Sequence, residues 1–329
     1  MKHQLLKYTV STALLAVFAA PVLAQTDPAS WPTKPIKWVV PFPPGGAMDA
    51  IARTLGEVTG RKLGQPFVIE NKAGAGGNIG SDFVAKQPAD GYTLIAGTSG
   101  PLGINPSVLP RLPYDAEKDF VGISNVAMVP LLVVAHPSLP YNTMQELAAA
   151  ARAQPGALNM ASAGPATSQH MAAELLMLRA NIRFNIVHYR GSGPGIADVI
   201  AGNVKLMTDS VASSLPHIRE GRVKPIALCS AQRVPQLPEV PTIAETLVPG
   251  YSAAGWSALV APAGTPVEIV RKINADVVAV LREPAIVARF NQMGAIADPQ
   301  TPEECAAFIR DEIAKWREVA RAADVKLEG

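Results

Sequence analysis

Short apolar runs alternate with amphipathic helical patterns along most of this chain, and no other feature limits its fold so strongly. Residues 36–40, 68–70 and 92–96 are apolar runs that predict strands. Between the first two runs, apolar residues from Met48 to Val58 recur at spacings of three and four, the period of an amphipathic helix. Because a strand, a helix and a strand follow one another, a parallel sheet with helical crossovers is predicted.

The middle and the last third of the chain repeat this order and add signals for helix starts. A threonine with a glutamate three positions later predicts a capping box, in which each side chain satisfies a backbone N–H. Such pairs are Thr143 with Glu146, Thr265 with Glu268, and Thr301 with Glu304. Further strands are predicted at residues 126–134, 158–161, 185–189, 206–209, 223–229 and 256–260.

Two α/β units of this kind predict an α/β protein with two sheets and a ligand cleft between them. The 329 residues also suffice for two domains, since single cores rarely grow beyond about 250–300 residues. We predict a discontinuous domain I, made of residues 25–125 and 252–329. Domain II, residues 126–251, is inserted between its parts. Such paired domains close around a ligand by bending at a hinge.

The start of the chain has the pattern of a secretory signal peptide. Lys2 and Lys7 make it basic, residues 8–20 carry no charge, and Val22 and Ala24 occupy the positions that a signal peptidase reads. The apolar run is shorter than the ~20 residues of a membrane-spanning helix. We therefore predict a signal peptide over residues 1–24, cleavage after Ala24, and export to the periplasm.

Cleavage there changes the charge of the chain. It removes two of the 29 basic residues and no acids, so that basic and acidic residues balance at 27 each. A neutral protein offers no electrostatic reason to bind nucleic acid or an anionic membrane. Aromatic residues make up only 5% of the chain, which argues against stacking on sugars or on single-stranded nucleic acid.

The chain has two cysteines, Cys229 and Cys305, which are 76 positions apart. In an oxidising compartment they could form a disulfide. No motif surrounds either of them, and Cys229 ends an apolar run, where a buried free thiol is the simpler interpretation. Both interpretations stay open on the sequence alone.

The turn after the first predicted strand is the strongest candidate for a ligand site. Residues 41–49 (PFPPGGAMD) combine prolines that stiffen the chain with two glycines, and a predicted helix follows at once. Free backbone N–H groups at a helix start attract anions, carboxylates included. Ligands of open α/β sheets also bind at the carboxyl ends of strands, where this turn lies. The alternative is a tight connection that binds nothing.

A second glycine-rich segment, residues 74–80 (GAGGNIG), also follows a strand and opens a helix. It resembles a dinucleotide-binding fingerprint, but Ile79 stands where that pattern requires its third glycine. We interpret this segment as a structural or cleft-lining loop.

Three predicted strand ends in the middle of the chain carry polar residues. After one of them, the hydroxyls of Thr167 and Ser168 either cap the next helix or donate to a bound carboxylate. Residues 189–194 form a similar turn, and Asp209 ends another strand. Polar groups that converge from several strand ends are typical of a cleft for a small polar solute.

The common signatures of enzymes are missing. No serine stands in a G-x-S-x-G motif, since residues 97–101 (GTSGP) lack the final glycine. The sequence contains neither a phosphate-binding loop nor an H-E-x-x-H motif, and its five histidines lack the spacing of a zinc site. His170 has no catalytic partner nearby, which favours a packing or hydrogen-bonding role. We therefore predict no catalytic residue, no metal and no cofactor.

At these segments the sequence resembles the Bug family of periplasmic receptors, which serve tripartite tricarboxylate transporters. The resemblance runs from about Trp31 to Val325 and rests on motifs in a fixed order. They are residues 31–36 (WPTKPI), 40–46 (VPFPPGG), Asp49 with Ala52 and Arg53, 71–80 (NKAGAGGNIG), 90–94 (DGYTL), 168–170 (SQH), 189–192 (YRGS), 241–245 (PTIAE) and 261–266 (APAGTP).

The resemblance implies a type II periplasmic-binding-protein fold that closes on a small carboxylate: a di- or tricarboxylate, an acidic amino acid or an aromatic acid. In the family, the turn matching Pro44 to Asp49 holds one carboxylate, partly through ordered water, and three segments of the second domain complete the cleft. The ligand-binding residues predicted in this way are Pro44, Gly45, Gly46, Ala47, Met48, Asp49, Ser99, Ala163, Thr167, Ser168, His170, Tyr189, Gly191, Ser192 and Asp209.

The sequence departs from the family pattern in two places. Met48 stands where a small hydroxyl residue is common, and Pro165 with Ala166 replaces a glycine-containing pair before Thr167. We hypothesise that both changes make the cleft more apolar and favour a larger or less charged acid.

Three functions are compatible with these observations. The leading one is a monomeric receptor that delivers a carboxylate to two integral-membrane transporter subunits. A ligand-sensing subunit for a membrane kinase uses the same fold, and the sequence does not separate sensing from uptake. An exported α/β hydrolase is the third, and the missing pair of nucleophile and base argues against it.

Overall fold

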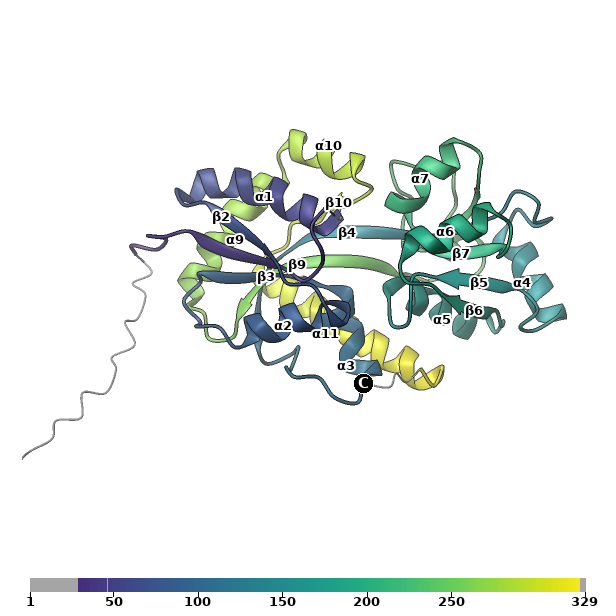
Figure 1. The fold of residues 1–329 in the computed structure, drawn as a ribbon, viewed down its shortest axis with the longest axis horizontal. Coiled ribbons are helices and arrows are strands. Elements are labelled where there is room, and N and C mark those ends of the chain that lie inside the picture. The colour runs from purple at the N-terminus through teal and green to yellow at the C-terminus, as the bar shows by residue number, and fades with distance from the viewer. Residues whose placement is uncertain (1–28, 46, 326–329) are drawn as a thin grey trace, which may run out of the picture.

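The computed structural model describes residues 29–45 and 47–325, and the predicted signal peptide lies outside them. Strands and helices alternate along the chain (Figure 1). The strands are β1 (Ile36–Val40), β2 (Phe67–Asn71), β3 (Thr93–Thr98), β4 (Phe120–Ala135), β5 (Asn159–Ser162), β6 (Asn185–His188), β7 (Leu206–Ser210), β8 (Lys224–Leu228), β9 (Ala254–Pro262) and β10 (Ile296–Ala297). The α-helices are α1 (Ala47–Leu63), α2 (Asn78–Ala85), α3 (Asn105–Val108), α4 (Met144–Ala153), α5 (Ser168–Ala180), α6 (Ser192–Ile200), α7 (Val211–Arg219), α8 (Ile243–Thr246), α9 (Val267–Leu281), α10 (Pro284–Gln292) and α11 (Pro302–Ala322). A 3-10 turn, η1 (Ala75–Gly77), and a π-helical turn, η2 (Ser99–Ile104), complete the set.

The predicted parallel pairings are present in both halves of the molecule. The strand order is β2-β1-β3-β9-β4-β7-β5-β6, with β8 and β10 paired to β4. β1 is parallel to β2 and β3, and β5 is parallel to β6 and β7. β4 and β9 run antiparallel to their neighbours.

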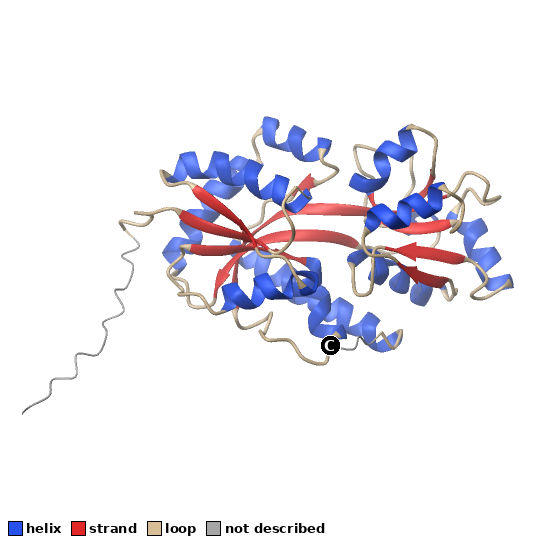
Figure 2. Ribbon diagram, in the orientation of Figure 1, coloured by secondary structure: helices blue, strands red, loops and turns tan. Residues whose placement is uncertain are grey.

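Strand β4 joins the two predicted sheets, because its 16 residues pair with different neighbours at its two ends. It pairs with β9 as far as Pro130, and from Leu131 onward it pairs with β7 and β8. The chain thus passes from one sheet to the other inside a single strand (Figure 2). The domain boundary predicted after residue 125 falls within this strand, and the predicted domain limits stay a prediction.

Apolar side chains fill both faces of the first sheet. Helices α1 and α9 cover one face, where Leu55 and Ile273 join Leu259 of β9 in one cluster. On the other face, Ile313 of α11 joins Val260 of β9. Helix α11 also extends under the second sheet, because its Trp316 and Val319 belong to a cluster with α4 and α5.

Two of the three predicted capping boxes are confirmed, those of Thr143 with Glu146 and Thr301 with Glu304. The third is wrong. Helix α9 has Pro266 as its N-cap, and the hydroxyl of Thr265 instead donates to the carbonyl of Pro262 at 2.8 Å, which closes the turn before the helix. A capping box that the prediction missed, Thr242 with Glu245, opens α8.

Cys229 and Cys305 are both free and both buried. They belong to different apolar clusters, one with α4 and α5 and the other with α2 and α11. Burial raises the pKa of each thiol to about 12, because the charged thiolate loses its hydration there. The sequence left a disulfide and two free thiols open, and in the structure both cysteines are buried free thiols.

Candidate functional site

The pairing directions bring the carboxyl ends of the parallel strands of both sheets to the middle of the molecule. β3 and β4 run in the same direction because each is antiparallel to β9, whereas β7 is antiparallel to β4. β1 is parallel to β3, and β5 and β6 run in the same direction as β7. The two sets of strands therefore point toward each other, and α1, η2, α5 and α6 all start in the region between them.

The turn between β1 and α1 is held together by the carboxylate of Asp49. Its Oδ2 accepts from the backbone N–H of Gly45 at 3.0 Å and from Nε of Arg53 at 2.9 Å. Its Oδ1 accepts from Nδ2 of Asn71 at 3.0 Å and pairs with Arg53 at 2.9 Å. The hydrogen bond from Arg53, with those from Gly45 and Asn71, lowers the pKa of Asp49 to about 2 against the effect of burial. Asp49 is thus fully paired and shapes the turn.

The other residues predicted on this turn differ in position. Pro44 and Gly45 are exposed, and Gly45 has a φ of +85°, which favours glycine. Met48 is half-buried and packs against the apolar cluster under α1. Gly46 lies outside the described residues, and of Ala47 only its place at the start of α1 is described.

In the second half, the loop between β5 and α5 is held by its own side chains. Thr167 caps α5, since its hydroxyl accepts from the N–H of His170 at 3.2 Å and donates to the carbonyl of Gly164 at 2.7 Å. The hydroxyl of Ser168 donates to Gln169 Oε1 at 3.2 Å. His170 is buried, and its Nδ1 accepts from the N–H of Ala166 at 3.1 Å. The capping interpretation of Thr167 is therefore confirmed.

The turn after β6 is tied to the same loop through its backbone. The N–H of Gly191 donates to the carbonyl of Ala163 at 3.0 Å. The phenol of Tyr189 donates to Asp198 of α6 at 2.7 Å and so is already paired. Burial, with the hydrogen bond to Asp198, raises the pKa of Tyr189 to about 12. Ala163 and Gly191 thus fix how the two turns lie together.

Asp209 is buried at the end of β7 and accepts two hydroxyl hydrogen bonds. Ser192, the first residue of α6, donates to its Oδ1 at 2.6 Å, and Ser214 of α7 donates to its Oδ2 at 2.7 Å. Because the single hydroxyl proton of Ser192 is used in this way, the oxygen of Ser192 can only accept from a ligand. Through these two hydrogen bonds, Asp209 holds the first turns of α6 and α7 in place.

Three hydroxyl groups at the opposite strand ends have no such partners. Thr98 ends β3 and Ser99 begins η2, and each is 6% exposed. Ser257 of β9 stands directly opposite Thr98 in the sheet and is fully buried. Within the described part of the chain, none of these hydroxyls makes a hydrogen bond. Ser99 was predicted; Thr98 and Ser257 were not, because only the pairing of β3 with β9 brings them together.

The predicted residues thus form two groups, one at α1 and η2 and one at α5, α6 and β7. No hydrogen bond among the described residues joins the two groups directly. A depression of about 500 Å³ is lined mainly by η1, α2 and the segment from Asn105 to Pro113, together with Pro165 and Ala166 from the β5–α5 loop; none of the predicted ligand-binding residues lines it. It therefore receives residues from both halves of the molecule.

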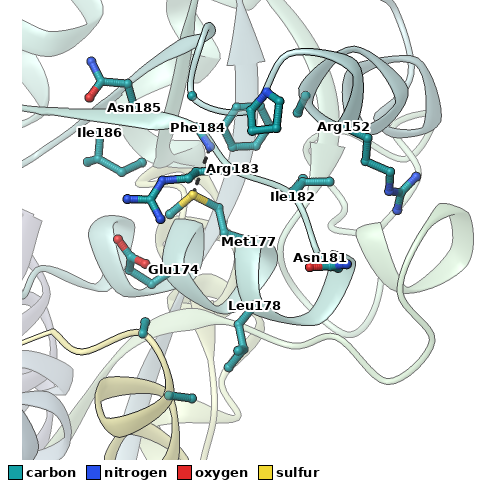
Figure 3. Close-up of a pocket in the computed structure, with 15 residues that line it drawn as sticks. Arg152, Glu174, Met177, Leu178, Asn181, Ile182, Arg183, Phe184, Asn185 and Ile186 are labelled. Carbon is teal, nitrogen blue, oxygen red and sulfur yellow. Dashed lines mark hydrogen bonds between the residues drawn. The ribbon is translucent and has the colours of Figure 1, made fainter.

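A depression of about 880 Å³ lies elsewhere, between α4, α5 and the start of β6 (Figure 3). Arg152, Glu174 and Arg183 line it, and the N–H of Phe184 donates there to the sulfur of Met177 at 3.1 Å. Because it adjoins the amino ends of β5 and β6, it is not part of the region where the strand ends converge.

The described residues offer little for metal chemistry. Among them, no three His, Cys, Asp or Glu side chains are grouped in a way that could hold a metal ion. In the same part of the chain, no helix combines the length and the apolar character that crossing a membrane requires.

Comparison with known proteins shows the family of the chain. Residues 51–325 match the family described as "Tripartite tricarboxylate transporter family receptor". The chain belongs to this receptor family. Among its relatives, the protein BugT of Bordetella pertussis is 39% identical over 314 residues, 95% of either chain. A UPF0065 protein from the tcbD-tcbE intergenic region of Pseudomonas sp. strain P51 is 41% identical over 291 residues, 88% of this chain and 86% of the other.

Two solved structures extend the family likeness to the fold. An R. palustris protein with adipate is 37% identical and superposes with a TM-score of 0.79, covering 89% of this chain and 98% of the other. MatC from Rhodopseudomonas palustris, with bound malate, is 33% identical with a TM-score of 0.75, covering 88% and 99%. The type II periplasmic-binding-protein fold and the Bug family resemblance predicted from the sequence are confirmed.

Proposed function

We propose that this protein is a periplasmic receptor that captures a small carboxylate-bearing solute and delivers it to two integral-membrane subunits of a tripartite tricarboxylate-type transporter. One observation carries the proposal: α1 begins at the end of β1, and α5 and α6 begin at the ends of strands that point the opposite way. The free N–H groups and the dipole at a helix start favour an anion. Opposed helix starts suit a solute with an acidic group at each end.

The relatives support this substrate class and the delivery step. Two members of the fold are solved with the dicarboxylates adipate and malate. The family is described as a receptor of tripartite tricarboxylate transporters. We propose that the protein acts in this way as a monomer, without a cofactor and without catalysis.

The hydrogen bonds divide the predicted site residues into two kinds. We propose that one carboxylate meets the first turn of α1 and the hydroxyl of Ser99, and that the other end of the solute meets the first turns of α5 and α6. Five predicted residues have side chains that are occupied by protein partners and support the site without contacting the solute: Asp49, Thr167, His170, Tyr189 and Asp209. The oxygen of Ser192 accepts from a donor group of the solute.

Thermal unfolding with a panel of acids tests the function. The protein is purified from the periplasm of an expression host, unfolded and refolded to remove bound solute, and mixed with adipate, malate, citrate, glutamate and benzoate. An acid at 100 times its dissociation constant raises the free energy of unfolding by about 2.7 kcal/mol. A selective rise, with the acid recovered unchanged, is expected. Chemical conversion of the acid would instead favour the hydrolase interpretation.

A second experiment tests delivery. The two membrane subunits are reconstituted in vesicles, and uptake of the labelled acid is measured with and without the receptor. We expect uptake only when the receptor is present. Binding without any receptor-dependent uptake would favour the sensor interpretation.

A further inference from the structure

Thr98 and Ser257 form a pair of buried hydroxyl groups that the protein leaves unsatisfied. They stand opposite each other on the antiparallel strands β3 and β9, so their side chains lie on the same face of the sheet. Thr98 is 6% exposed and Ser257 is fully buried, and neither hydroxyl has a hydrogen-bond partner within the described part of the chain. A buried polar group without a partner costs free energy, and most proteins avoid it.

The alternation of side chains shows which face of the sheet they occupy. Ala96 and Leu259, the pair next to them, belong to the cluster that packs under α1. Gly97 and Ala258 come between and face the other way, so Thr98 and Ser257 return to the face of α1. Both hydroxyls therefore lie on the side of the sheet that α1 covers.

Their position along the strand is also determined. Thr98 is the last residue of β3, and α1 starts at the matching end of β1, the neighbour of β3. Helix α1 then runs back over the sheet, where Ile51 and Leu55 pack on the same cluster as Ala96. The two hydroxyls thus lie on the α1 side of the sheet at the end of β3, where the strand ends converge.

We propose that Thr98 and Ser257 form a subsite that donates two hydrogen bonds to a carboxylate oxygen of the solute. The inference rests on the proposed function and names side-chain donors for it. Two neutral hydroxyls, like the N–H groups of a helix start, supply donors to an anion without a basic residue. The neighbouring Ser99, which is also buried and unpaired, adds a third donor at the same strand end.

A purely structural role makes a different prediction from a ligand subsite. Hydroxyls that stabilise the fold would lower the stability of the ligand-free protein when removed. Removing a hydroxyl whose role is to bind the ligand leaves the stability of the ligand-free protein unchanged or raises it, because an unsatisfied buried polar group is no longer present. Substitution therefore separates the two roles by comparing stability without ligand and affinity for the ligand.

The experiment uses Thr98→Val and Ser257→Ala, with Thr59→Val as the matched control. Thr59 is also buried with an unpaired hydroxyl, but it lies near the far end of α1, away from the strand ends. Affinities for adipate, malate and citrate are measured by calorimetry, and ligand-free stability by urea unfolding. We expect Thr98→Val and Ser257→Ala each to weaken binding of the accepted acid roughly tenfold. The urea midpoints should be equal to or above that of the wild type, and Thr59→Val should leave the affinity unchanged.

Two results would overturn the subsite while leaving the proposed function in place. One is wild-type affinity in both Thr98→Val and Ser257→Ala, and the other is a lower urea midpoint of the ligand-free variants. A wild-type protein that binds no acid of the panel would overturn the proposed function and the subsite together.

Discussion

The backbone N–H of Ala166 donates a hydrogen bond to Nδ1 of His170 at 3.1 Å, from the loop before α5 to the first turn of that helix. Ala166 has a φ of +52°, a left-handed conformation that residues with a side chain rarely adopt. The other ring nitrogen of His170 meets Glu174 at 3.2 Å. His170 was predicted as a site residue, and its hydrogen bonds hold the loop before α5 in place.

Replacing His170 by leucine should therefore loosen the loop. The buried N–H of Ala166 would lose its acceptor, and we expect a loss of about 1–3 kcal/mol in the free energy of unfolding, together with weaker ligand binding. The matched control is His170→Asn, whose side-chain oxygen can accept the same bond. Urea unfolding compares the two variants. Equal midpoints for leucine and asparagine would contradict a role of the ring in holding Ala166.

The network around Asp49 should make part of the stability depend on pH. Its folded-state pKa of about 2 lies below the ordinary value of 3.8, so its contribution is present above about pH 4 and is lost as the pH falls toward 2. We expect Asp49→Asn to cost about 1–2 kcal/mol at pH 7, less than the pKa shift alone implies because Arg53 is half exposed. Urea unfolding at several pH values should show the difference from the wild type shrinking below pH 4.

Helix α1 provides the control for this prediction. Glu57 and Arg61 have the same spacing on the same helix, but both side chains are about two-thirds exposed, at 66% and 67%. Glu57→Gln should change the free energy of unfolding by less than about 0.5 kcal/mol at any pH. A loss as large as that of Asp49→Asn would mean that burial of Asp49 and its bond to Gly45 are unimportant.

The two thiols should be inert in the folded protein. Burial raises the pKa of Cys229 and of Cys305 to about 12, so almost no reactive thiolate is present at neutral pH. We expect no reaction with a thiol reagent under native conditions and reaction of both cysteines in urea. Mass spectrometry after alkylation checks this. A disulfide-linked peptide pair in the exported protein would contradict it.

Strand ends were predictable from the sequence because apolar runs and turns are local signals. The run at residues 206–209 became β7, which ends at Ser210. Strand β4 was predicted too short, since Ser124 and Asn125 are polar and yet buried, and only their neighbours in the fold make them suitable for a strand. A local pattern carries no information on such neighbours.

For the candidate site, too, local features were predictable from the sequence and tertiary contacts were not. The sequence indicated which turns converge, but not which polar atoms of those turns are already paired. Asp49 and Asp209 were predicted to face the ligand, and whether they do stays untested, although their carboxylates already have protein partners. Thr98 and Ser257 are 159 positions apart, and only the pairing of two distant strands brings them together. Tertiary pairing, which no motif encodes, decides which donors remain free.

A close backbone contact links the part of the chain before β10 to the start of α7. Gly294 has a φ of +71°, and a Cβ on it would come within 2.5 Å of the Cα of Ala212 and 2.8 Å of its N. Beside it, Nε2 of Gln236 donates to the carbonyl of Asn291 at 3.1 Å. These contacts join segments that were predicted to belong to different domains.

Replacing Gly294 by alanine should force these segments apart. The matched control is Gly250→Ala, because Gly250 has a similar φ of +77° but no atom within 4 Å of an added Cβ. The control carries only the conformational cost, about 1–2 kcal/mol. Gly294→Ala should lose about 1–3 kcal/mol more in urea unfolding, because the methyl group meets backbone atoms that cannot rotate away. If both variants lost the same free energy of unfolding, the close contact between Gly294 and the backbone of Ala212 would not contribute to stability, which would contradict this prediction.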